Sequence, residues 1–169
     1  FVSVNYRLSP EVMHPIHVQD VANAIAWVHH NVEAYGGEPE RLFLVGHSAG
    51  AHLVALVGVD ERYLKKAGKD LGILSGVVPL DSAAYDIPLR LWLAGNGMEE
   101  MIANAFGTDP EVLADASPVN HVAPGKGIPD FLLVYVASRE IARVEAEGFE
   151  EKLVEANVPV EVYPAENKN

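Results

Sequence analysis

The stretch from Gly46 to Gly50 reads Gly-His-Ser-Ala-Gly and joins two apolar segments of different kinds. Residues 41–45 form a short apolar run typical of a buried strand, and residues 48–59 suit a buried helix. The flanking glycines allow the strand and the helix to approach each other closely across a sharp turn. The stretch therefore predicts a strand–turn–helix unit, which constrains the chain to an α/β fold.

Further apolar runs alternate with helical patterns along the rest of the chain. Strands are expected over residues 2–6, 73–80, 131–136 and 158–163, and helices over residues 17–35 and 143–156. Phe149, Leu153 and Val154 are expected to face inward, and Pro159 places the last strand near an edge. Continuously apolar strands are typical of a parallel sheet with helices on both faces. We therefore expect one α/β domain over residues 1–169.

Residues 82–122 interrupt this alternation, because short apolar clusters there are separated by glycine and proline. We expect an insertion of short helices that covers the sheet as a lid. Tyr85, Leu91, Trp92 and Phe106 would then offer an apolar wall to a ligand. Packing of the lid against the sheet explains each of these four side chains equally well.

The composition excludes several classes of function. The chain carries 24 acidic and 12 basic residues, a net charge of −12, which argues against nucleic acid and anionic membrane surfaces as partners. It has no cysteine, so disulfides, thiolate catalysis and cysteine-bound zinc are excluded. No apolar run approaches the length of a membrane span. The cytoplasm is the default location, and secretion stays open because the chain begins with Phe1.

Ser48 occupies the position of a nucleophile in the strand–turn–helix unit. The backbone N–H of Ala49, at the start of the helix, would stabilise a developing oxyanion. His47 stands beside the serine and is expected to pack or to line the pocket. The alternative is a glycine-rich turn in which Ser48 only caps the helix.

Several phrases extend this pattern over nearly the whole chain, namely residues 4–11 (VNYRLSPE), 35–42 (YGGEPERL), 46–53 (GHSAGAHL) and 116–122 (ASPVNHV). They resemble the carboxylesterase branch of the α/β-hydrolases that is related to hormone-sensitive lipase and to feruloyl-esterase-like enzymes. The resemblance implies cleavage of small carboxylic esters through an acyl-enzyme on Ser48. It implies no metal and no organic cofactor.

Two parts of such an enzyme are absent from the sequence. The family's glycine-rich oxyanion loop would lie upstream of Phe1, and its catalytic histidine would follow Asn169. His121 precedes the fourth strand and so breaks the family order of serine, acid and histidine. We therefore expect the middle of a longer hydrolase, inactive alone, with a bare sheet edge that favours self-association.

The catalytic acid has two candidates. No aspartate follows the strand at residues 131–136, where the family places its acid, and counting along the chain reaches Glu140 instead. Asp81, at the tip of the strand at 73–80, is preferred, although it would also serve as a helix cap. An amidase such as a formamidase uses the same machinery, and a non-catalytic binding protein is the alternative of a different class.

Overall fold

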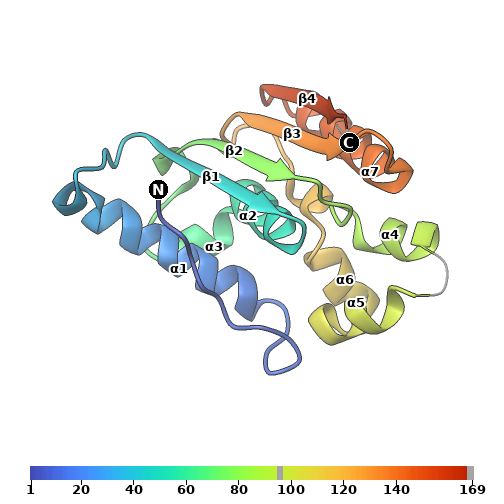
Figure 1. Cartoon of the computed structure of the whole chain (residues 1–169). Helices are drawn as coiled ribbons and strands as arrows, with labels where there is room; N and C mark the ends of the chain where they lie inside the picture. Colours follow the sequence, from blue (N-terminus) through green and yellow to red (C-terminus); the bar gives the residue numbers. More distant parts are fainter. Residues whose placement is uncertain (95–96, 167–169) are drawn as a thin grey trace.

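The computed structural model describes residues 1–94 and 97–166 (Figure 1). The strands among these residues form one sheet of four. The strands lie in sequence order, and each neighbouring pair is parallel. Their bounds are β1 (Leu42–His47), β2 (Leu74–Leu80), β3 (Phe131–Val136) and β4 (Val160–Ala165). The predicted parallel sheet is therefore confirmed, and the carboxyl ends of its strands share one edge.

The long helices gather on one face of this sheet (Figure 1). They are α1 (Ile16–Asn31), α2 (Ala49–Val59) and α7 (Glu140–Glu155). On β3, the ring of Phe131 lies against Gly58 of α2 and meets the ring of Phe149 of α7 at 5.5 Å between centroids. These contacts place α2 and α7 on the same side. No helix within residues 1–94 and 97–166 is long and apolar enough to cross a membrane.

The opposite face of the sheet is open in the described residues. Phe43 and Val45 of β1 are each 56% exposed there. The expectation of helices on both faces is therefore wrong for this part of the chain. The reason is topological, because right-handed crossovers between strands in sequential order put every connecting helix on the same side.

Residues 2–6 form no strand, contrary to the sequence prediction. Phe1 and Val2 are exposed, whereas Tyr6 packs against the core with its ring edge-on to His17. Alternating β-branched residues favour an extended backbone, but a strand also needs a hydrogen-bonded neighbour. None of the four described strands lies beside this segment as a partner.

The remaining element boundaries differ modestly from the prediction. Helix α3 (Glu61–Lys66) was not predicted, although Asp60 caps it by accepting the N–H of Arg62 at 3.1 Å. Strand β4 begins two residues late, and α7 begins three residues early. Phe149 and Leu153 are buried as expected, but Val154 is 59% exposed, so its inward assignment is wrong.

The insertion after β2 does consist of short helices. They are α4 (Ile87–Ala94), α5 (Glu99–Phe106), α6 (Pro110–Asp115) and the 3-10 turn η3 (Pro118–His121). These elements share a small apolar cluster of their own, separate from the main core, formed by Ile87, Ile102, Leu113 and Ala116. The insertion thus lies next to the carboxyl edge of the sheet as a small packed unit (Figure 1).

Candidate active site

Ser48 connects β1 to α2 in a strained backbone conformation. Its φ is 54° and its ψ is −116°, a region that costs a residue with a side chain about 1–3 kcal/mol. The surroundings hold it there, because its N–H donates to the carbonyl of Leu80 at 3.0 Å. Its own carbonyl accepts the N–H groups of Ala51 and His52. The predicted strand–turn–helix unit is therefore present, with the serine at its apex.

The two glycines of the turn have different roles. A Cβ on Gly46 would lie 2.2 Å from the carbonyl oxygen of Gly50 and 2.9 Å from the nitrogen of Ala51. A Cβ on Gly50 would meet nothing within 4 Å. The close approach of strand and helix thus depends on Gly46, whereas the sequence suggested that both glycines allow it.

Ser48 opens onto a cavity of about 480 Å³ at the carboxyl edge of the sheet. Ala49 and Asp81 line the same cavity. The apolar part of its wall comes from the N-terminal segment and from α5, and includes Leu8, Pro10, Met101, Ile102 and Phe106. The position of Ala49 at the first turn of α2 leaves its N–H beside the serine, as an oxyanion site requires.

Three residues expected at the pocket do not line this cavity. His47 is exposed at the end of β1, and Trp92 is 79% exposed. Tyr85 is buried in the main core, where its ring stacks on Phe149 at 4.7 Å. Of the lid residues singled out from the sequence, Phe106 lines the cavity, and Leu91 packs against the cluster of the insertion.

The two candidate acids lie in different surroundings. Asp81 follows β2 with a φ of 53°, and its carboxylate accepts the N–H of Val136 at 3.0 Å and pairs with Arg139. Glu140 is the first residue of α7; its side chain is 73% exposed, pairs with Arg143 and does not line the cavity. Asp81 is thus the candidate that shares the cavity with Ser48.

Sequence reasoning missed three histidines of the cavity wall, namely His14, His17 and His52. His17 Nε2 lies 3.0 Å from the hydroxyl of Ser9, and His52 Nε2 donates to the carbonyl of Ala116 at 2.8 Å. Burial lowers the pKa of His52 to about 4, so its ring is neutral near pH 7. Each of these rings is engaged elsewhere and none bonds to the Ser48 hydroxyl in the described part of the chain.

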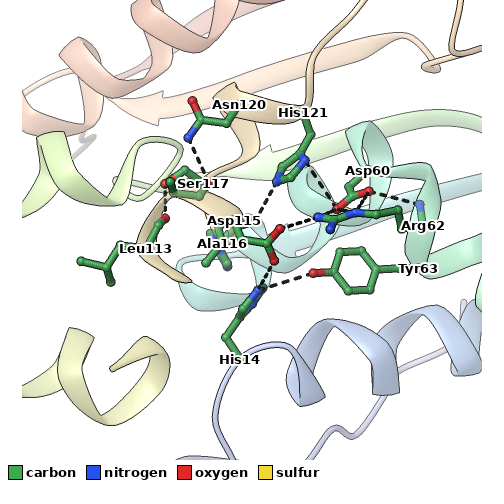
Figure 2. Close-up of polar contacts among 12 residues, drawn as sticks. His14, Asp60, Arg62, Tyr63, Leu113, Asp115, Ala116, Ser117, Asn120 and His121 are labelled. Carbon is green, nitrogen blue, oxygen red and sulfur yellow. Dashed lines mark hydrogen bonds and ion pairs between the residues drawn. The ribbon is translucent and has the colours of Figure 1, made fainter. Parts of the chain in front are cut away.

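A polar network fixes the third of these rings, His14 (Figure 2). His14 Nε2 lies 3.1 Å from a carboxylate oxygen of Asp115 and 3.5 Å from the hydroxyl of Tyr63. Arg62 bridges Asp115 and the buried Asp60 at 2.7 and 2.6 Å. The network ties the N-terminal segment, α3 and α6 together, and so holds one wall of the cavity in place.

The remaining expectations concern residues away from the cavity or beyond the described chain. His121 does not line the cavity, and its Nε2 donates to the carbonyl of Asp115 at 2.7 Å. The histidine expected beyond Asn169 lies outside the described residues. Within residues 1–94 and 97–166, no three His, Cys, Asp or Glu residues gather in a way that could hold a metal ion.

The arrangement of strand, strained serine, helix and helical insertion invites comparison with known proteins. A family model described as the alpha/beta hydrolase fold matches residues 1–169. The chain belongs to the α/β-hydrolase fold family. A hyperthermophilic esterase from the archaeon Pyrobaculum calidifontis shares this fold with a TM-score of 0.78 at 23% identity, over 98% of the present chain and 56% of that chain.

Two curated enzymes are similar in sequence to this α/β-hydrolase chain over most of its length. Esterase LipC of Mycobacterium tuberculosis is 32% identical over 162 residues, which cover 90% of the chain and 40% of that protein. Kynurenine formamidase of Meyerozyma guilliermondii is 32% identical over 121 residues, 72% of the chain and 44% of that enzyme. The resemblance to the carboxylesterase branch is confirmed, and the chain spans less than half the length of these two relatives.

Proposed function

We propose that this chain carries the nucleophile and the acid of a serine hydrolase that cleaves carboxylic esters. The observation that carries the proposal is Ser48, held at a φ of 54° between a buried strand and helix and opening onto a cavity of about 480 Å³. The family supports it, because curated esterases match most of the chain.

In the proposed reaction, Ser48 Oγ attacks the ester carbonyl carbon and gives its proton to a histidine base. The Ala49 N–H stabilises the negative oxygen of the tetrahedral intermediate. The alcohol then leaves with the proton from the histidine, which gives an acyl-enzyme. Water attacks this ester in turn, releases the carboxylic acid and returns a proton to Ser48.

Asp81 is proposed to orient and stabilise that histidine. Its place in the cavity with Ser48 favours it over Glu140. The ion pair with Arg139 neutralises the negative charge of the Asp81 carboxylate. This contact favours the alternative of a non-catalytic binding protein. The short helices α4–α6 are proposed to act as a lid, since Ile102 and Phe106 of α5 line the cavity.

Amide hydrolysis is the second candidate. The observation in its favour is the similarity to a kynurenine formamidase over 72% of the chain. The same attack by Ser48 would expel an amine in place of an alcohol. Relative turnover of aryl esters and N-formyl aryl amides by the full-length protein separates the two reactions.

Fluorophosphonate labelling of the full-length protein tests the nucleophile. We expect one label on Ser48, lost in Ser48→Ala and retained in Ser9→Ala. Ser9 is a matched control, because it also lines the cavity but its hydroxyl donates to the carbonyl of Val12. Ester turnover should disappear with the label. A folded Ser48→Ala protein that still turns over esters, or a folded wild type that takes no label, contradicts the assignment.

A further inference from the structure

Glu145 is a carboxyl group of α7 that the proposed reaction does not use. Its side chain is buried, and its Oε2 accepts the N–H of Tyr85 at 2.8 Å and the N–H of Asp86 at 2.9 Å. These two donors directly precede α4, the first helix of the insertion, and α4 packs against α7 (Figure 1). One side chain of α7 therefore holds the start of the insertion.

The start of α4 needs such acceptors, because the first N–H groups of a helix have no partner within the helix. The carboxylate of Asp86 accepts the N–H of Leu89 at 3.1 Å. The hydroxyl of Ser117 accepts the N–H of Ile87 at 3.0 Å. Both of these acceptors belong to the insertion itself. Of the three acceptor side chains, Glu145 is thus the one that ties the helix start to the rest of the fold.

The segment that Glu145 holds is also part of the cavity wall. Asp81 and the three residues after it line the cavity, and Tyr85 follows them directly. Arg90, one turn into α4, lines the cavity as well. Asp81 is fixed on its other side by β3, because its carboxylate accepts the N–H of Val136. Loss of the Glu145 bonds would therefore free the stretch of wall next to Asp81.

The charge of Glu145 depends on these surroundings. Burial raises the pKa of its carboxyl group to about 7, because water is excluded and Oε1 has no hydrogen-bond partner. The N–H groups of Asp86 and Tyr85 and the positive charge of Arg90 lower this pKa, whereas the carboxylate of Asp86 adds to the rise. The side chain therefore gains or loses its proton near neutral pH.

Other charged groups around α7 are engaged elsewhere. On α7 itself, Arg143 pairs with Glu140 and Glu147. Among the described residues, the remaining titratable side chains on the strands and the 3-10 turn packed against α7 make no hydrogen bond to Glu145, and they are Tyr135, His121, Glu161 and Tyr163.

We propose that Glu145 is a positioning residue, whose carboxyl group fixes the segment between Asp81 and α4 and so holds the insertion at the Ser48 cavity. Its consequence for turnover rests on the proposed function, in which Asp81 is the acid. Glu145→Gln keeps an oxygen for the two N–H groups but has no proton to titrate, whereas Glu145→Leu leaves both donors without this acceptor.

The held segment is more stable below pH 7 than above it, because an ionised Glu145 is better solvated once the segment opens. The pKa is about 7 in the closed segment, against an ordinary value of 4.5 when the carboxyl group is exposed. Linkage then gives about a tenfold fall in the protection of the segment between pH 6 and pH 8.

Amide hydrogen exchange of the full-length protein, followed by mass spectrometry, measures this protection without any need for catalysis. At pH 6, Glu145→Leu should lower the protection of residues 82–94 about tenfold or more, with α1 unchanged, and Glu145→Gln should retain it. In wild type, the protection should fall about tenfold from pH 6 to pH 8 after correction for the intrinsic exchange rate, and in Glu145→Gln it should stay constant. Glu147→Gln is the matched control, because Glu147 lies on the same helix with its side chain exposed and paired with Arg143.

Turnover by the full-length protein supplies the second measurement. Glu145→Leu should lower kcat about tenfold or more through displacement of Asp81, and Glu145→Gln should restore it. A folded Glu145→Leu protein whose residues 82–94 have lost protection but whose kcat is unchanged would reject the positioning role.

Three exchange results would also overturn the inference. They are unchanged protection of residues 82–94 in folded Glu145→Leu, an equal loss in Glu145→Gln, and a loss that extends equally to α1. If Glu145→Leu does not fold, wild type and Glu145→Gln decide, and identical pH profiles overturn the inference. A full-length wild type without ester turnover rejects the proposed function instead, and the exchange measurements still decide whether Glu145 holds the segment.

Discussion

Gly46 and Gly50 look equivalent in the sequence, and the structure predicts opposite effects of replacing them with alanine. Gly46, next to last in β1, has no room for a side chain, because a Cβ would lie 2.2 and 2.5 Å from the carbonyl oxygen and carbon of Gly50 and 2.9 Å from the Ala51 nitrogen. All three atoms belong to the backbone of α2. No rotamer change can relieve the overlap, so strand and helix must separate.

The magnitude follows from this geometry. Overpacking in a well-packed core costs about 1–3 kcal/mol, and overlap with rigid backbone belongs at the upper end, so Gly46→Ala should destabilise the protein by about 3 kcal/mol. Gly50 has free space around its Cβ position and lies in the first turn of α2. Gly50→Ala should therefore be neutral or stabilising by about 0.5 kcal/mol, since alanine restricts the unfolded chain.

Urea unfolding of both variants, followed by circular dichroism, measures the difference. The midpoint should fall strongly for Gly46→Ala and stay or rise for Gly50→Ala, with similar slopes for the two curves. Fluorophosphonate labelling adds a local probe, because separation of β1 and α2 would also displace Ser48. A Gly46→Ala protein within about 0.5 kcal/mol of wild type would refute the reasoning, as would equal losses in both variants.

Two further predictions concern the acid and a buried histidine. In the full-length protein, Asp81→Asn should lower ester turnover by about four orders of magnitude, as loss of the orienting acid does in serine hydrolases, whereas Glu140→Gln should change it less than about twofold. Steady-state kinetics check this ranking, and the reverse ranking would move the acid to Glu140. Burial lowers the pKa of His52 to about 4, below its ordinary value near 6.5, so the folded state resists protonation of this ring. Its contribution to stability is complete above about pH 6.5 and falls by about 3 kcal/mol in all as the pH drops through that value toward 4. His52→Gln keeps a donor for the Ala116 carbonyl but does not titrate, so unfolding in urea at pH 7.5 and 5 should show a smaller loss than in wild type; equal losses would reject this role for His52.

Much of the fold could be predicted because its signals are local. The apolar runs at β1, β2 and β3 and the helical periods of α1 and α7 are read from neighbouring residues, and the structure places these elements within about four residues of their predicted bounds. The prediction of a strand at residues 2–6 was wrong for the opposite reason. Its pattern is as strand-like as the others, but a strand exists only where a neighbour supplies hydrogen bonds.

The candidate site also contains residues that the sequence predicts and residues that only the structure shows. Ser48 and Ala49 follow from one local motif, in which strand, turn and helix are consecutive in the chain. The three histidines of the wall carry no such motif, because what distinguishes them is contact with segments far away in the chain. His14 meets Asp115, 101 residues later in the chain.

The sequence by itself determined the parallel α/β order, the insertion and the strained serine, since each depends on a pattern of residues that are consecutive in the chain. Only the tertiary structure decided that the helices cover one face, that Gly46 rather than Gly50 sets the approach of β1 to α2, and that Asp81 shares a cavity with Ser48. Those features depend on which surfaces meet when the strands pair. A local pattern specifies the elements, whereas packing between distant elements specifies the site.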